Sequence, residues 1–484
     1  MTADRITPHV WRIAIVVILG AIMSVLDTTI VNVALDTLSK DLHSSLDDIQ
    51  WVVTGYMLSL AAVIPVSGWA VTRFGAKRLY LISLVLFTAG SALCGLSWST
   101  GSLIAARVLQ GLGGGLLMPV GQMILVKAAG PRNMAKVMSA IGVPIILAPV
   151  FGPTLGGLLV EHAGWQWIFF VNLPVGIAAV TAALRMLPRD EDTRAMAGRL
   201  DAPGLALVAS GLVGITYGLA QSGAAGTLAD RSVLVPFLLG LGLVAAFVVR
   251  ALHIERPLLD LRLYANKAFA AASVTMFALG AALFGAMVLM PLYFQLVRHE
   301  DAVTTGMLVA PQGIGAAVAM FLGGRATMRW GGGLTSVIGG SIAIVATVPF
   351  LLVDATTPFW TIGAAMVVRG FGIGMSMMPS MTAAYAVLRP DQVNDATPQM
   401  NVLQRVGGSI GTAILTVVLQ SGITGLAHPT PAGIAHSFAH TYWWVIAISA
   451  VALAPTVLLT VVERRTRAAA AGVPADVTLE AAAV

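Results

Sequence analysis

The side chain best placed to do chemistry in this sequence is the carboxyl group of Asp27, which interrupts an apolar run from Ile13 to Leu35. The hydrocarbon core of a bilayer is ~30 Å thick and takes about 20 helical residues, so this run is long enough to cross it. A charged side chain within that core costs at least ~2.5 kcal/mol. The sequence has 22 Asp and Glu residues, and all the others fit loops, helix ends or tails. We therefore expect Asp27 to bind and release a proton.

Arg107 offers a cation at a similar depth. At 1.5 Å per residue, Asp27 lies ~22 Å along the first helix and Arg107 lies ~8 Å into a run that enters from the other side. Burial favours the neutral form of a carboxylic acid and a nearby cation favours the charged form, and these opposed effects suit a proton carrier. Our hypothesis is that Asp27 alternates between a proton and a cationic or polar substrate, while Arg107 sets its affinity. The alternative is a static ion pair that holds two helices together.

Both residues must be positioned by membrane helices, because the composition is that of a polytopic membrane protein. Of the 484 residues, 57% are hydrophobic and 10% are charged, whereas soluble domains carry about 25% charged residues. A lipid-exposed irregular backbone leaves polar groups unpaired, so each long apolar run is predicted to be a helix. The count falls to twelve if two Gly-rich runs in the middle of the chain are not membrane helices. The fourteen runs are 12–34, 50–71, 79–98, 102–125, 135–160, 165–187, 202–220, 232–252, 267–295, 302–325, 333–353, 358–379, 398–422 and 441–462.

The basic residues predict the orientation of these helices. With the N-terminus inside, 22 of the 28 Lys and Arg residues fall on inner segments, three on outer loops and three within helices. Basic residues concentrate on the cytoplasmic side of membrane proteins. We therefore expect an even number of spans with both termini in the cytoplasm. The net charge of +6 then reflects topology, and no nucleic-acid partner is expected.

Two motifs recur in the same order in both halves of the chain. Residues 68–75 (GWAVTRFG) match residues 324–331 (GRATMRWG), and Gly111 to Pro119 resembles Gly370 to Pro379, at offsets of 256 and 259 residues. Duplicated halves with a site at their interface are typical of transporters. The expected domains are an N-terminal six-helix bundle (1–187), two inserted helices (188–266), a C-terminal six-helix bundle (267–467) and a disordered tail (468–484).

Five segments together resemble the successive motifs of the major facilitator superfamily, and more narrowly those of its fourteen-helix drug:proton antiporters. The resemblance implies the major facilitator fold and proton-driven export of small, mostly lipophilic compounds by alternating access. It covers most of the chain and keeps the order of the motifs. The segments are LDTTIVNVAL (26–35), GWAVTRFGAKR (68–78), ARVLQGLGGGLLMP (106–119), APVFGPTLGGLL (148–159) and WQWIFFVNLPVG (165–176).

The same resemblance implies a gating loop and an antiporter motif. The family normally has an acid at the position of Thr72, where it takes part in a charge network that closes the cytoplasmic side, and Thr72 cannot replace that charge. The remaining basic residues of the loop either gate the transporter or only set its topology. The loop residues are Gly68, Arg73, Gly75, Lys77 and Arg78, and the antiporter motif comprises Gly142, Pro149, Gly152, Pro153, Gly156 and Gly157.

Substrate contacts are predicted from residue type. Flexible thioethers suit pockets that accept many ligands, and aromatic faces attract lipophilic cations. Gln110 shares a helix face with Arg107, although plain helix packing explains it equally well. Arg369 and Arg405 have no acid at membrane depth in their half, and we expect structural roles for them. The candidates for substrate contact are Gln110, Asn32, Tyr56, Trp51, Phe284, Tyr293 and Met377.

The sequence offers no signal for an enzyme, a metal site or a cofactor. The eight His residues are scattered, Cys94 is the only cysteine, and the chain has no nucleotide-binding GxxxxGK[ST] motif. We expect a monomer embedded in membrane lipid, whose partners are protons and a lipophilic substrate. One acid in the membrane favours a neutral or monovalent cationic substrate. The alternatives are an exporter of an endogenous lipid, siderophore or metabolite, and a receptor or sensor built on a transporter scaffold.

Overall fold

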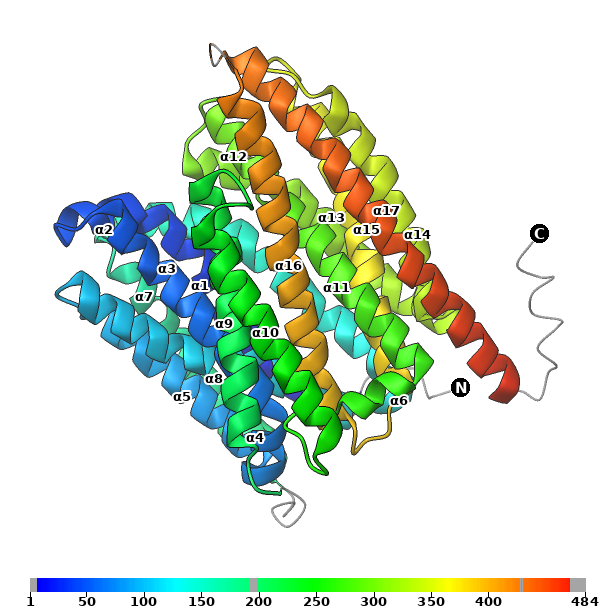
Figure 1. The fold of residues 1–484 in the computed structure, drawn as a ribbon. Coiled ribbons are helices and arrows are strands. Elements are labelled where there is room, and N and C mark those ends of the chain that lie inside the picture. Colours follow the sequence, from blue (N-terminus) through cyan, green and yellow to red (C-terminus); the bar gives the residue numbers. More distant parts are fainter. Residues whose placement is uncertain (1–6, 191–197, 427, 429, 471–484) are drawn as a thin grey trace.

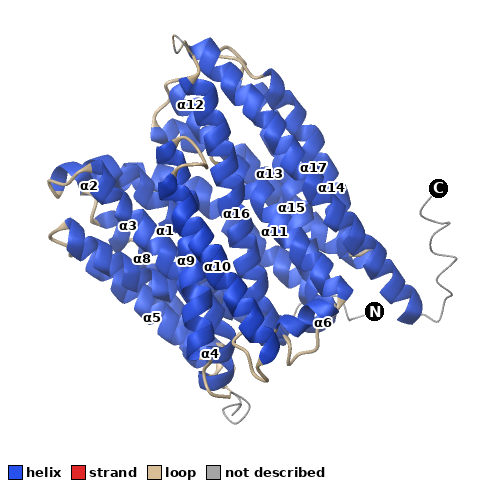
Figure 2. Ribbon diagram, viewed as in Figure 1, coloured by secondary structure: helices blue, strands red, loops and turns tan. Residues whose placement is uncertain are grey.

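The computed structural model describes residues 7–190, 198–426, 428 and 430–470, and every regular element in this part of the chain is a helix (Figures 1 and 2). The predicted all-α membrane fold is therefore confirmed. Among the described residues, 13 segments are long and apolar enough to cross a membrane. They include α9 (Ala202–Ala225) and α10 (Arg231–His253), which the two Gly-rich runs form.

The N-terminal half ends with α8, and its longest helix contains two predicted spans. Helix α6 has 64 residues, or ~96 Å at 1.5 Å per residue, which is far longer than one bilayer crossing. Gly130 interrupts it with φ 65° and ψ 171°, so that two helical segments meet there. The elements are α1 (Pro8–Ile30), η1 (Val31–Ala34), α2 (Leu35–Asp41), α3 (Leu46–Val63), η2 (Ile64–Val66), α4 (Ser67–Phe74), α5 (Ala76–Gly95), α6 (Thr100–Ala163), α7 (Trp167–Phe170) and α8 (Asn172–Met186).

The C-terminal half follows α10 and repeats this order of long helices. Several predicted runs are split in both halves, because proline or a tighter helical turn interrupts the hydrogen-bond ladder. The elements are η3 (Leu261–Ala265), α11 (Lys267–Met287), α12 (Leu289–Leu296), α13 (Ala302–Trp330), α14 (Gly332–Thr347), η4 (Val348–Leu352), α15 (Phe359–Ala386), α16 (Val393–Thr424) and α17 (Pro431–Ala470). The predicted disordered tail beyond Ala470 lies outside the described residues.

The repeated loop motif has the same backbone conformation in both halves. Gly75 ends α4 with φ 89° and ψ 150°, and Gly331 ends α13 with φ 94° and ψ 161°. Residues other than glycine rarely adopt this backbone conformation, which explains why glycine ends both copies. The repeat seen in the sequence is therefore also a repeat of structure.

The two inserted helices lie beside the junction of the halves. Helix α9 packs against α10, against α3 of the N-terminal half and against α16 of the C-terminal half. Trp51 of α3 stacks on Tyr217 of α9, with 5.6 Å between ring centroids. The inserted helices thus contact both halves without separating them.

The halves are joined mainly at one end of the bundle. We call this the basic end, and it holds the C-terminal ends of α4 and α17. In Figure 1 the two halves converge at this end and diverge toward α2 and α12. The largest apolar core contains Val10 and Met123 of the N-terminal half together with Met320 and Met381 of the C-terminal half. Two further cores each draw on a single half. Apolar contact between the halves is therefore concentrated toward the basic end.

Candidate functional site

Asp27 lies near the end of α1 and is fully buried. Its Oδ2 accepts a hydrogen bond of 2.5 Å from Nη1 of Arg107, on the first segment of α6. Its Oδ1 accepts hydrogen bonds from the side-chain amides of Gln110, at 2.9 Å, and Asn172, at 3.3 Å. The structure therefore brings together the predicted residues Asp27, Arg107 and Gln110. We call these three and Asn172 the carboxylate cluster.

Arg107 is held on several sides. Nη1 also donates to Oε1 of Gln110 at 2.7 Å, and Nε donates to the backbone carbonyl of Val52 in α3 at 3.1 Å. Its guanidinium carbon lies 4.0 Å from the centroid of the Tyr56 ring. Cation–π contact of this kind adds to the stabilisation of a desolvated cation. Helices α1, α3 and α6 therefore meet around one guanidinium group.

Polar residues of other helices extend the cluster. The Asn172 amide donates to Oγ of Ser91 in α5 at 3.1 Å, and Ser91 donates to the carbonyl of Phe169 at 2.8 Å. Asn172 belongs to the motif at 165–176, and its polar side chain in that apolar setting is the one signal that could have identified it. Ser91 carries no comparable signal.

The cluster is sealed within the N-terminal half. Asp27, Arg107, Gln110 and Asn172 are each at most 2% exposed, and the described side chains that donate hydrogen bonds to Asp27 all belong to that half. Desolvation of a buried ion pair is offset only with the help of additional hydrogen bonds, and here Gln110, Asn172 and the Val52 carbonyl provide them. A cargo has no direct contact with the carboxylate in this conformation.

The seven residues predicted to contact substrate do not form one site. Gln110 and Tyr56 belong to the surroundings of Asp27, and substrate contact stays a prediction for all seven. The other five are scattered. Asn32 is exposed, Trp51 stacks on Tyr217, Phe284 packs against Gly408, Tyr293 donates to the Asp354 carbonyl, and Met377 borders a cavity in the C-terminal half.

An acid that the sequence did not single out contacts the gating loop. Asp190, from the segment after α8, accepts hydrogen bonds from the backbone N–H groups of Lys77 at 2.8 Å and Arg78 at 3.0 Å, in the first turn of α5. A carboxylate is favourable at a helix N-terminus, where N–H groups lack intrahelical partners. Nζ of Lys77 donates to the carbonyl of Leu187 at 2.8 Å, whereas Arg73 is exposed.

The C-terminal half repeats this capping arrangement. Glu463 of α17 accepts hydrogen bonds from the backbone N–H groups of Gly332 at 3.1 Å and Gly333 at 2.7 Å, in the first turn of α14. In each half, an acid from the last helix or just after it therefore caps the helix that follows the repeated motif.

Thr72 takes part in a neutral contact between the halves. Nδ2 of Asn394 in α16 donates to Oγ1 of Thr72 at 3.1 Å, and Nδ2 of Asn401 donates to Oε1 of Gln122 at 2.8 Å. A Cβ atom on Gly68 would overlap the Asn394 carbonyl oxygen. Uncharged hydrogen bonds and close backbone contact thus join the halves at the gating loop and at Gln122.

We expect Gly68→Ala to loosen the basic end. Forcing a methyl group into a packed contact costs ~1–3 kcal/mol, and this raises the population of the opened end at least about fivefold. The measurement is the rate of maleimide labelling at Asn401→Cys, since the native Cys94 is buried. The control is Gly101→Ala, because nothing lies within 4 Å of a Cβ there. Equal labelling rates in the two backgrounds would contradict the expectation.

The antiporter motif lies on the second segment of α6. Gly152 contacts Thr29 and Gly156 contacts Ile30, so this segment packs closely against the end of α1. The side chains of Pro149 and Pro153 lie outside the described part of the chain. The two remaining glycines face the C-terminal half, Gly142 against Met320 and Gly157 against Val303.

These features define an integral membrane protein with two repeated helical halves and a buried polar cluster in the first half. The Major Facilitator Superfamily model matches residues 17–412, and the chain belongs to that family. It is a transporter and not an enzyme.

Named relatives agree with this assignment. The multidrug resistance protein B homolog of Mycobacterium tuberculosis (strain ATCC 25618 / H37Rv) is 42% identical over 86% of this chain and 77% of its own length. The multidrug export protein EmrB of Escherichia coli (strain K12) is 30% identical over 83% and 78%. The solved structure of the proton:xylose symporter XylE has a TM-score of 0.62 at 13% identity, covering 92% of this chain and 94% of that one, and it shows the fold alone.

Proposed function

We propose that the protein exports small lipophilic drugs, neutral or singly cationic, across a bacterial cytoplasmic membrane in exchange for protons. The names of the two relatives that are 42% and 30% identical over the aligned regions support drug export. The basic residues gathered on one side support cytoplasmic termini. In this proposal the two six-helix halves alternate access around their interface, and α9 and α10 lie beside it.

The observation that carries proton coupling is the buried pair of Asp27 and Arg107. Protonation of Asp27 removes the charge that compensates Arg107. The other contacts of Arg107 are uncharged, namely the Gln110 and Val52 oxygens and the Tyr56 and Phe169 rings. A neutral carboxylic acid and an unpaired guanidinium group favour a different arrangement of α1 and α6. Proton binding at Asp27 therefore changes the position of α1 relative to α6.

A contiguous set of contacts leads from Asp27 to the junction of the halves. Thr29 and Ile30 follow Asp27 closely in α1 and pack on Gly152 and Gly156 of α6. The same segment of α6 meets α13 of the C-terminal half at Gly157. Because Asp27 is sealed from the interface, we propose that cargo and proton are coupled through these helices, without direct competition for the carboxylate.

The arrangement of the apolar cores supports an outward-facing state. The core shared by both halves lies toward the basic end, and the cores farther from it are separate. With the basic end in the cytoplasm, the structure is closed to the cytoplasm. The transport cycle would then require separation of the contacts of Asn394 and Asn401 with Thr72 and Gln122.

Transport by purified protein in proteoliposomes tests this function. With an acidic lumen, we expect a lipophilic monovalent cation such as ethidium to accumulate inside while the lumen becomes more alkaline. A protonophore should abolish both signals. Accumulation that is insensitive to the protonophore would contradict proton coupling, and ligand binding without accumulation would favour the receptor alternative.

A further inference from the structure

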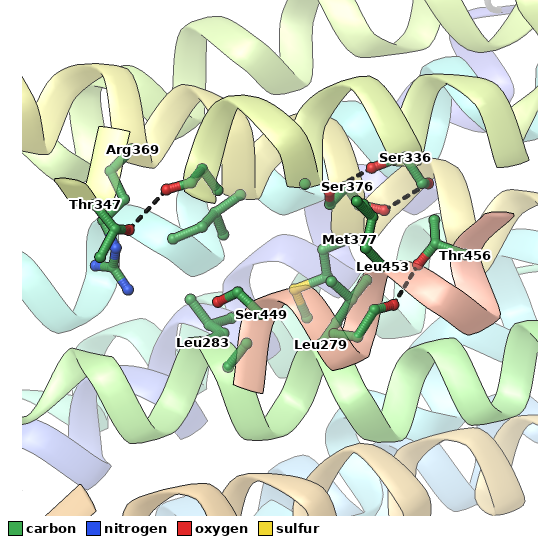
Figure 3. A pocket seen from close by; sticks show the side chains of 15 residues that line it. Leu279, Leu283, Ser336, Thr347, Arg369, Ser376, Met377, Ser449, Leu453 and Thr456 are labelled. Atoms are coloured by element: carbon green, nitrogen blue, oxygen red, sulfur yellow. Dashed lines mark hydrogen bonds between the residues drawn. The ribbon is translucent and has the colours of Figure 1, made fainter. Parts of the chain in front are cut away.

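A cavity of about 40 Å³ lies within the C-terminal half, between α11, α14, α15 and α17 (Figure 3). Leu279 and Leu283 of α11 line one wall, and Ser449 of α17 lines another. A water molecule needs ~10–15 Å³ of such volume, so the cavity has room for about three waters or for one small ion or acidic group.

Arg369 of α15 borders this cavity and has no counter-ion among the described residues. Its side chain is 3% exposed, and its one side-chain hydrogen bond to the described residues runs from Nη1 to Oε1 of Gln312 at 3.0 Å. A guanidinium group has five N–H donors and is always charged. Nη2 and Nε therefore remain without a protein acceptor in the described structure, although buried cations are normally paired.

The cavity occupies the place that the carboxylate cluster occupies in the N-terminal half. A Cβ on Gly113 of α6 would meet Phe87 of α5, and a Cβ on Gly372 of α15 would meet Ala343 of α14. The offsets are 259 residues for the glycines and 256 for their partners. Helix α15 therefore packs on α14 as α6 packs on α5, in the register that the sequence repeat predicts.

The same offsets place Arg369 at the position of Gln110 and Thr347 at the position of Ser91. Both Gln110 and Ser91 belong to the surroundings of Asp27, and both Arg369 and Thr347 line the cavity. The halves differ on the remaining wall. Where α1 supplies a carboxylate, α11 supplies leucine and alanine side chains, so the C-terminal half has a cation without its anion.

We propose that this cavity binds a small anion, of the size of a halide or a carboxylate group, at Arg369. The Ser449 hydroxyl forms no hydrogen bond with the described residues and is available as a second donor. The Tyr442 hydroxyl of α17 is likewise buried without a hydrogen-bond partner in the described structure, although it does not line the cavity. The anion comes either from solution or from an acidic cargo. The inference does not depend on proton-coupled export.

Equilibrium binding of radioactive chloride to the purified full-length protein, with gluconate as the background salt, tests the proposal. We expect saturable binding of about one chloride per chain, weakened at least tenfold in Arg369→Gln and largely kept in Arg369→Lys. Benzoate, but not benzamide, should compete if the site also takes acidic cargo. Absence of saturable binding to the wild type, or unchanged binding in Arg369→Gln, would overturn the proposal.

A second pair of variants keeps Arg369 in place. Leu283→Asp supplies the missing carboxylate, so it should abolish chloride binding, whereas Leu283→Asn changes the volume similarly and should retain it. Size-exclusion profiles and melting temperatures show whether each variant is folded. Because drug transport is measured separately in proteoliposomes, a failure of export leaves the binding result interpretable. Equal chloride binding by folded Leu283→Asp and wild type would count against the site.

Discussion

We expect the replacement of Asp27 by asparagine to abolish proton-driven drug accumulation while the protein remains folded. Asparagine has the shape of aspartate and its one amide oxygen can still accept the hydrogen bond from Arg107, but it cannot exchange a proton at working pH. We expect the gradient-dependent rate to fall at least about a hundredfold, which corresponds to ~2.7 kcal/mol of barrier. The measurement compares wild type and variant in proteoliposomes across a range of lumenal pH, and the variant should lose the pH dependence.

The control for this variant is Asp36→Asn. Asp36 lies in α2 and forms an exposed ion pair with Lys40 at 2.6 Å, and such pairs contribute little. The same chemical change at that position should leave transport and its pH dependence intact. Proton-coupled export at the wild-type rate in Asp27→Asn would remove Asp27 from the mechanism, although the assignment to the transporter family would stand.

Arg107→Met should be among the most destabilising single substitutions in the chain. It leaves the Asp27 carboxylate buried without its cation, and breaking a buried pair in this way costs ~3–5 kcal/mol. The cost falls when both charges are removed, because a buried pair replaced by apolar side chains is often close to neutral. We therefore expect Asp27→Leu combined with Arg107→Met to recover most of the lost stability.

Thermal unfolding of the purified variants in detergent measures this coupling. The double variant should melt close to wild type and well above Arg107→Met, yet show no proton-driven transport. If the double variant were no more stable than Arg107→Met, the two side chains would not be energetically coupled, and the ion pair would not explain the stability of the cluster. Stability and transport thus report on separate roles of the same pair.

The sequence did not predict two of the contacts described above, namely the helix cap at Asp190 and the contact of Thr72 with Asn394. Asp190 is one of several charged residues in a polar segment, and its hydrogen bonds to Lys77 and Arg78 follow only from the path of the chain after α8. Asn394 meets Thr72 across 322 residues. Neither contact has a local pattern, because an exposed acid or amide is inexpensive in many positions.

The sequence by itself determined the all-helical membrane fold and the repeat, and it singled out Asp27 as the candidate for proton binding. In lipid every backbone polar group must form a hydrogen bond within the protein, so each long apolar run is expected to form a helix. A carboxylate within such a helix costs free energy, and this cost is why Asp27 stands out in the sequence. Only the tertiary structure decided that Asn172 and Ser91 complete the cluster, that Asp27 is sealed from the interface, and that Arg369 has no counter-ion in the part of the chain that the structure describes. These depend on which helix faces meet across the fold, and apolar helices in lipid carry little directional information about their neighbours.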